Sequence, residues 1–329
     1  MRSTTRLAAA LMASVVLCAV LLASVATGCT WGGDAEEGDV VMSPENTYEN
    51  TRTGDRTKSS TDTRTDTSEA LHGDPSTVAS ASATESSPPP TKLTVLYDNR
   101  VAQPAPAPGL KADWGFACLV EGYDSTVLFD TGATGYALLS NMDALGIDPD
   151  IVEVVVLSHD HGDHTGGLAR LLKRNPDVTV YCPASFSQSF TRTIEDAGAT
   201  VVRLDDPMSP CPGVTVTAPL EKGSITELGL TVDTQQGPVL LTGCAHPGVV
   251  NMAEAATDLA GQPLHAVLGG FHLYEYSSAR VADVIAELQG LGVSRCGPCH
   301  CTGDRAIAQF EEAFGSDFIP MGVGAVVEF

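Results

Sequence analysis

The sequence predicts a layered α/β fold for residues 91–329. Three observations support it: hairpin-forming strands early in this region, alternating strands and helices later in it, and no internal repeat at a fixed period. Alternation of this kind favours stacked layers of sheet and helix over a helical bundle or an all-β sandwich. A region of about 240 residues is also long enough to form one domain with a sizeable core.

The first half of the region is expected to contain mainly strands. Apolar and β-branched runs predict the strands, and the spacing of apolar residues predicts the helices, one of which stops at Gly146. The expected elements are a strand at 92–98, a hairpin of 116–121 with 125–132 that turns at 122–124, a helix at 136–146, a buried strand at 151–160, a helix at 166–175 and a strand at 177–183.

The second half alternates strand and helix. Its expected elements are a strand and loop at 237–248, a helix at 249–259, a strand and loop at 264–273, a helix at 277–292, a strand and loop at 293–300, a helix at 304–315 and a final strand at 325–329. Histidines follow the ends of four expected strands, at 159–164, 246, 272 and 300. Open α/β sheets bind ligands at such strand ends.

The first ninety residues differ in composition from the rest. Arg2 and Arg6 precede the apolar run Leu7–Ala26, and small residues then lead to Cys29. This pattern resembles a lipoprotein signal over residues 1–29 with lipidation at Cys29; the alternative is an uncleaved anchor, since about 20 apolar residues can span a bilayer. Residues 30–90 are rich in Ser, Thr and Asp and predict a disordered tether. We therefore expect the domain outside the cytoplasm, held to the cell membrane by a lipid or an apolar anchor.

The charge of the chain argues against a nucleic-acid partner. The sequence has 18 Lys and Arg against 41 Asp and Glu, for a net charge of -23. Phosphate backbones favour clustered Lys and Arg, and no basic stripe is visible. We expect a small-molecule substrate instead, and the oligomeric state stays open.

The densest cluster of chemically active residues is LSHDHGDHTGG at 157–167. It holds His159, His161, Asp163 and His164 at the end of a buried strand. Imidazole and carboxylate are ligands that borderline divalent metals prefer. In a near-extended segment His159 and His161 point the same way and can chelate one ion. Gly162 lets the chain bend, so Asp163 and His164 can face a second ion.

A second cluster, RCGPCHCTGD at 295–304, is open to three interpretations. Cys296, Cys299 and His300 match a haem-attachment pattern, the first two match a thioredoxin-like redox pair, and the group could also bind a metal. A redox pair needs its first cysteine at a helix start, whereas the helix here is expected after Gly303. The metal interpretation explains both clusters at once. The cysteines of this stretch, including Cys301, then shape the loop or form a disulfide among themselves.

The H-x-H-x-D-H pattern resembles the signature of the metallo-β-lactamase superfamily. LFDTG at 128–132 is similar to the family's early strand-end motif. From about Leu93 to Phe329, the motifs GCAHPG, GGFHL and HCTG in this order resemble the branch that contains the dihydropterin–aminobenzene ribofuranosyl phosphate synthases. The resemblance implies a four-layer αββα sandwich and a centre of two zinc or similar divalent ions.

The resemblance also implies roles for individual residues. His159, His161 and His246 would hold one ion, and Asp163, His164 and His300 the other. Asp130 would brace the metal-binding loop through contacts with the ligands. Cys244 falls where many members have a metal-bridging aspartate; it is a ligand, a thiol beside the ligands or a small buried residue. His272 binds metal, contacts the substrate or is an ordinary loop histidine, and we take it, with Asp163, as a catalytic candidate.

The predicted function is a metal-dependent hydrolase. Water held between two such ions would have its pKa lowered from 15.7 to roughly 7, giving a hydroxide that attacks an ester, amide or phosphoester. Asp163 could also orient this water. One alternative is an extracytoplasmic redox or haem lipoprotein that uses Cys296, Cys299 and His300. The other is a non-catalytic metal-binding module on the same fold.

Overall fold

The computed structural model describes residues 90–329. The predicted signal segment at 1–29, and all of the predicted tether except Pro90, lie outside the described residues. Within 90–329, no helix is both long enough and apolar enough to cross a membrane.

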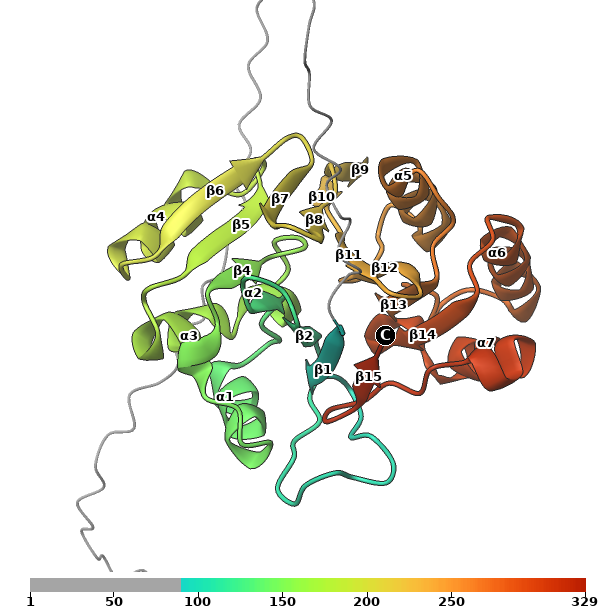
Figure 1. Ribbon diagram of the computed structural model, residues 1–329, viewed down its shortest axis with the longest axis horizontal. Coiled ribbons are helices and arrows are strands. Elements are labelled where there is room, and N and C mark those ends of the chain that lie inside the picture. The colour runs from blue at the N-terminus through green and yellow to red at the C-terminus, as the bar shows by residue number, and fades with distance from the viewer. Residues whose placement is uncertain (1–89) are drawn as a thin grey trace, which may run out of the picture. The chain divides into compact units, whose positions relative to one another are not determined.

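Two β-sheets lie face to face, and helices cover the outer face of each (Figure 1). The first sheet has the strand order β15-β1-β2-β3-β4-β5-β6, and the second has the order β14-β13-β12-β11-β8-β7. A separate two-stranded ribbon pairs β9 with β10. The predicted four-layer αββα sandwich is therefore confirmed.

The first sheet is antiparallel from β15 to β3 and parallel from β3 to β6. Its strands are β1 (Lys92–Tyr97), β2 (Ala117–Glu121), β3 (Val127–Phe129), β4 (Val154–Val156), β5 (Thr179–Pro183), β6 (Thr200–Leu204) and β15 (Val326–Glu328). The helices that follow these strands are α1 (Gly135–Ala144), the one-turn α2 (Gly162–Thr165), α3 (Leu168–Arg174) and α4 (Gln188–Asp196), with a 3₁₀ turn, η1, at Pro149–Ile151.

The second sheet is parallel from β12 to β14 and antiparallel elsewhere. Its strands are β7 (Met208–Cys211), β8 (Val214–Val216), β11 (Leu230–Thr234), β12 (Gly237–Thr242), β13 (Ala266–Gly270) and β14 (Arg295–Cys299), and the ribbon is β9 (Leu220–Lys222) with β10 (Ile225–Glu227). The helices are α5 (Val249–Ala260), α6 (Ser278–Gly290) and α7 (Asp304–Phe314), with 3₁₀ turns η2 (His300–Thr302) and η3 (Gly315–Asp317).

Alternation along the strands sorts side chains between the layers. In β2, Cys118 and Val120 face the core between the sheets, whereas Ala117 and Leu119 face the helices of the first half. Successive side chains of a strand point to opposite faces, so a strand buried between two layers carries apolar side chains on both faces.

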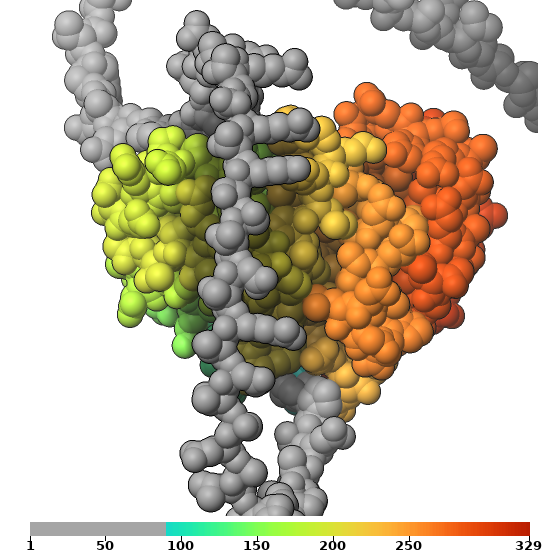
Figure 2. All heavy atoms as spheres, turned by 90° about the horizontal axis from the view of Figure 1, so that it is seen from above, coloured from blue at the N-terminus to red at the C-terminus, as the bar shows by residue number. Residues whose placement is uncertain are grey.

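Figure 2 views the domain from the side of β7 and β9, with atoms of the first half in yellow-green and atoms of the second half in orange to red.

The elements expected from the sequence are present, including the hairpin of β2 with β3. The strand expected at 151–160 is shorter than predicted, because β4 ends at Val156 and the chain then enters the histidine-rich loop. Residues 184–236, for which no element was predicted, form α4 and the strands β6 to β11. All six of these strands have only three to five residues, which gives a weak periodic signal.

Candidate metal centre

Four strand ends turn sharply toward one site. Among the described residues, the only non-glycine positions with positive φ are Asp130 (58°), Ala245 (56°), His272 (51°) and His300 (48°). They follow β3, β12, β13 and β14 by one to three residues. This left-handed backbone costs of order 1–3 kcal/mol per residue and persists where the surrounding structure enforces it, commonly at functional sites.

The first predicted ligand group is brought together. His161 Nδ1 lies 3.1 Å from His159 Nε2 and 3.2 Å from His246 Nε2. Two nitrogens bound at 2.0–2.1 Å to one tetrahedral zinc are roughly 3.3 Å apart. The spacing of the three imidazoles therefore fits a single shared ion.

The second predicted group also converges. The Oδ2 atom of Asp163 lies 3.7 Å from His164 Nε2 and 3.4 Å from His300 Nε2. His300 Nε2 is buried and makes no hydrogen bond. This nitrogen thus faces a carboxylate and a second imidazole and lacks a hydrogen-bond partner. A divalent ion bound by the three groups would supply the missing partner.

Cys244 lies between the two groups. Its Sγ atom is 3.2 Å from His164 Nε2. It also falls within 4.8 Å of the ligand atoms of His159 and His246 on one side and of Asp163 and His300 on the other. Cys244 is buried, but its sulfur faces nitrogen and oxygen ligands as well as apolar neighbours. Its position suits a thiolate that bridges two ions.

Asp130 contacts the metal-binding loop as predicted. Its Oδ2 atom lies 2.7 Å from His164 Nδ1 and accepts a 2.7 Å hydrogen bond from Ser158 Oγ. The same hydroxyl lies 2.9 Å from His159 Nδ1. Asp130 thus fixes one histidine directly and another through Ser158, and both keep Nε2 directed at the site. Such contacts set the tautomer and the ring orientation of metal-binding histidines.

Glu227 holds the loop after β12. This carboxylate, fully buried at the end of β10, accepts hydrogen bonds from the backbone N–H groups of Cys244 (2.8 Å), Ala245 (2.7 Å) and His246 (2.7 Å). Burial raises the pKa of Glu227 to about 7, and the three N–H donors oppose that rise. Nothing in the sequence marks Glu227 as a functional residue, because a single buried Glu in a short strand has the same local pattern as an exposed one.

The end of β1 supports His300 and was also missed. Asp98 Oδ1 accepts a 3.0 Å bond from the backbone N–H of His300, and Asn99 Oδ1 lies 3.1 Å from His300 Nδ1. Trp114 donates from Nε1 to Asp163 Oδ2 at 2.8 Å. The sequence did contain a signal: Asp98 ends the strand predicted at 92–98 and Asn99 follows it, near a strand end like the four histidine loops.

Comparison with known proteins decides the family. The model of the metallo-β-lactamase superfamily matches residues 115–249. The 7,8-dihydropterin-6-methyl-4-(β-D-ribofuranosyl)-aminobenzene-5′-phosphate synthase of Methanocaldococcus jannaschii is 30% identical over 263 residues, which cover 65% of this chain and 90% of that one. The chain belongs to the metallo-β-lactamase superfamily.

Solved structures agree with this assignment. Tm1679, described as a metal-dependent hydrolase of the β-lactamase superfamily, aligns with a TM-score of 0.61 and 26% identity over 73% of this chain and 99% of that chain. The metallo-β-lactamase-fold protein YhfI from Bacillus subtilis aligns with a TM-score of 0.55 and 14% identity over 73% and 100%. The second likeness concerns the fold alone.

The histidines of this metallo-β-lactamase-fold centre differ in charge. Burial and neighbouring imidazoles hold the pKa of His159 well below its ordinary value and lower that of His246 to about 3. These rings are neutral at pH 7, so each has a lone pair available for a metal. Burial alone would lower the pKa of His164, but the Asp130 carboxylate raises it to about 9. Burial would raise the pKa of Asp163, yet His300 and His164 hold it well below its ordinary range.

A cavity of about 300 Å³ opens beside the centre. His246 and His272 contribute to its wall, and the apolar side chains of Val249, Phe271 and Leu273 line part of it. The rings of His246 and His272 are 4.4 Å apart between centroids. His272 therefore lies between the metal-ligand candidates and a space that a small molecule can enter.

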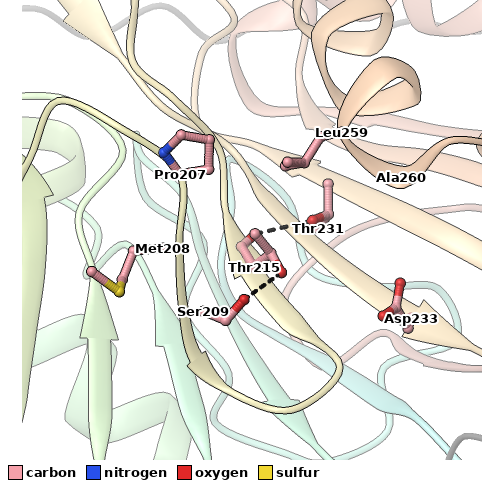
Figure 3. A pocket seen from close by; sticks show the side chains of 8 residues that line it. All are labelled: Pro207, Met208, Ser209, Thr215, Thr231, Asp233, Leu259 and Ala260. Atoms are coloured by element: carbon pink, nitrogen blue, oxygen red, sulfur yellow. Dashed lines mark hydrogen bonds between the residues drawn. The ribbon is translucent and has the colours of Figure 1, made fainter. Parts of the chain in front are cut away.

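A slightly larger hollow, of about 350 Å³, lies elsewhere. It is lined by residues of β7, β8 and β11 and the end of α5, where Ser209 and Thr215 share a hydrogen bond (Figure 3). Asp233 is its sole ionisable lining residue, and no histidine or cysteine lines it. With a single carboxylate and no imidazole, this hollow lacks the ligand set that lies beside the smaller cavity.

The redox interpretation of residues 296–300 does not match the geometry. Cys296 packs among the helices outside the second sheet, whereas Cys299 packs between the two sheets. The two sulfurs thus lie on opposite faces of β14 and cannot pair there, and burial raises the pKa of both thiols. All seven cysteines of residues 90–329 are free thiols. The helix expected after Gly303 begins at Asp304, as predicted.

Proposed function

We propose that this protein is a metal-dependent hydrolase acting on an ester, amide or phosphoester bond of a small molecule. The observation that carries the proposal is the convergence of five imidazoles, Asp163 and Cys244 from separate strand ends beside a cavity of about 300 Å³. Imidazole, carboxylate and thiolate together are the ligand set of zinc and similar ions.

Two ions fit the ligands present. His159, His161 and His246 would hold one of them, and Asp163, His164 and His300 the other, with Cys244 between the two. When bound, such ions supply activation of water and polarisation of the scissile carbonyl or phosphoryl group.

The chain's own residues supply orientation. Trp114 donates a hydrogen bond to one oxygen of Asp163, so the position of this carboxylate is fixed and Asp163 can orient the attacking water by accepting a hydrogen bond from it. Asp130 and Glu227 hold the histidine-bearing loops in place through their hydrogen-bond contacts with His164 and His246. His272 projects from the wall of the cavity and would contact the bound substrate.

A synthase activity is the second candidate. The relative that carries a synthase name is 30% identical and matched over 90% of its length, which favours a shared use of the metal centre. A synthase would join two substrates and leave single esters intact, so a panel of hydrolase substrates separates the two candidates.

The test is metal analysis of the purified protein together with a panel of ester, lactam and phosphoester substrates. We expect at least two equivalents of divalent metal, which would fill the proposed pair of sites, and turnover of at least one substrate class. His161→Ala should lose activity by several orders of magnitude, whereas His265→Ala changes a half-buried histidine outside the centre and should retain it. Full activity in His161→Ala would refute the mechanism.

We also propose that the protein is lipid-anchored on the outer side of the cytoplasmic membrane. The support is the N-terminal pattern: Arg2 and Arg6, the apolar run Leu7–Ala26 and Cys29 after small residues. Metabolic labelling with a fatty acid should mark the wild-type protein and leave Cys29→Ala unmarked. Equal labelling of both would contradict the anchor at Cys29.

A further inference from the structure

Three further ligand atoms meet at the rim of the centre. Cys244, His272 and Cys301, here called the thiol triad, follow the ends of β12, β13 and β14. Their sulfur and nitrogen ligand atoms all lie within 4.8 Å of one another. Cys244 is 3% exposed and Cys301 is 1% exposed. The triad thus brings two protected sulfurs and one imidazole together, and the proposed hydrolytic mechanism uses neither Cys301 nor this grouping.

The approach of the two sulfur-bearing residues depends on Gly270. A Cβ atom at this position would lie 2.8 Å from Cys301 Sγ and 3.3 Å from Cys244 Cα. Any larger residue would push the loop after β14 away from the loop after β12. Cys301 Sγ also lies 3.5 Å from the backbone oxygen of Cys244, a weak contact that holds the sulfur over the neighbouring loop.

His272 provides an independent sign of a missing ligand. Its Nδ1 atom is shielded from solvent and makes no hydrogen bond with any described residue. A buried polar atom without a partner costs about 1–3 kcal/mol, and most such atoms in native proteins are satisfied by water, an ion or a ligand. His272 also has a left-handed backbone, at φ 51°, and its ring lies 4.4 Å from the ring of His246 between centroids.

We propose that the thiol triad is a third cation site, for Zn²⁺ or another thiophilic ion, that shares the Cys244 sulfur with the metal centre proposed above. Thiolate and imidazole are ligands that thiophilic ions prefer over oxygen. In a tetrahedral zinc site with Zn–S bonds of about 2.3 Å, two sulfurs are roughly 3.8 Å apart, so the observed limit of 4.8 Å requires only small movements.

The Cys244 sulfur can bind more than one ion, because a thiolate has more than one lone pair. Three protein ligands leave one tetrahedral position open, the arrangement of catalytic rather than structural zinc sites. His272 lines the cavity of about 300 Å³. A water molecule or a substrate atom in that cavity would therefore complete the coordination of the third ion.

The experiment uses cobalt as the probe. Purified metal-free protein is titrated with Co²⁺, and the bound equivalents are measured together with the absorption band that arises from thiolate-to-cobalt charge transfer. The wild-type protein is expected to bind three equivalents. Cys301→Ala should bind one equivalent fewer and lose about half of the thiolate band. Cys296→Ala, a matched change of a buried cysteine near the start of β14, should alter neither value.

Two further variants keep the test decisive. His272→Ala should show the same loss of one equivalent and serves if Cys301→Ala fails to fold. His161→Ala removes a ligand of the first ion only, so it should abolish hydrolysis and retain the thiolate band of the triad. Failure of the hydrolase proposal with an intact triad signal is thereby distinguishable from failure of the triad.

Folded Cys301→Ala and His272→Ala proteins with unchanged stoichiometry and an unchanged thiolate band would overturn the third site. A Cys244–Cys301 disulfide in the purified protein, with no third equivalent bound after reduction, would overturn it as well.

Discussion

The three hydrogen bonds to Glu227 give a sharp prediction about stability. Glu227→Ala removes the acceptor for the backbone N–H groups of Cys244, Ala245 and His246, of which the first two make buried hydrogen bonds and the third a part-buried one. Each buried donor left without an acceptor costs about 1–3 kcal/mol. Allowing for partial compensation by an entering water, we expect the free energy of unfolding to fall by about 3–6 kcal/mol, which is a large part of the 5–15 kcal/mol typical of a domain.

Glu227→Gln separates hydrogen bonding from packing. The amide retains the volume and one carbonyl acceptor, which can still serve Cys244 and Ala245 through the Oε1 position. Its NH₂ group would replace Oε2 and face the N–H of His246, so we expect a loss of about 1–3 kcal/mol. The control is Glu221→Ala, on an exposed position of the adjacent strand β9, which should stay within about 0.5 kcal/mol.

The assay is urea denaturation of the purified metal-free protein, followed by circular dichroism, with the slope of the transition compared between variants. Metal-free protein removes any contribution of ligand binding from the comparison. A loss of less than 1 kcal/mol in Glu227→Ala, or equal losses in the alanine and glutamine variants, would refute the account of Glu227 as the acceptor that holds the loop after β12.

Three other outcomes follow from the same contacts. Zinc at 100 times its dissociation constant stabilises a folded protein by about 2.7 kcal/mol. Calorimetry should therefore show a melting temperature about 5–11 °C higher with saturating zinc, and a chelator should reverse the rise. An unchanged melting temperature would contradict metal binding by the folded state. Asp130→Asn removes the anionic partner of His164 Nδ1 and should weaken metal affinity by about 10–100-fold in competition titrations, and an unaltered affinity would argue against its bracing role. Trp114→Phe removes the donor to Asp163 and should lower kcat/KM about 2–10-fold with little change in stability, whereas loss of folding would show a structural role instead.

Local signals in the sequence predicted a layered α/β fold and most of its elements, and the family resemblance supplied the four-layer arrangement. The hairpin at 116–132 and the alternating strands and helices after residue 237 each depend on periodicity and turn residues within a few positions. The convergence of the candidate ligands was likewise predictable, because all six follow strands, and layered α/β folds gather ligands at the carboxyl ends of their strands. Short strands between 184 and 236 lacked enough residues for a clear period, so β6 to β11 were not anticipated.

The supporting residues were not predictable for a different reason. Glu227 acts on a loop that begins 17 residues further along the chain, and Asp98 acts on His300, 202 residues away. The strand-end position of Asp98 is visible in the sequence and that of Glu227 is not, but the partners of both arise from tertiary contacts that leave no local pattern. The thiol triad depends on the missing side chain of Gly270, and a single glycine at a strand end does not indicate what approaches it.

X-ray absorption spectroscopy at the zinc edge tests the central claim most directly, because it reports the atoms around the metal itself. Zinc-loaded protein should show imidazole nitrogens at about 2.0–2.1 Å with a minor sulfur contribution at about 2.3 Å, and a metal–metal distance of about 3.5–4 Å. His161→Ala should diminish the nitrogen shell and the metal–metal signal together. A spectrum without a metal–metal distance, unchanged in His161→Ala, would contradict a centre built from these strand ends.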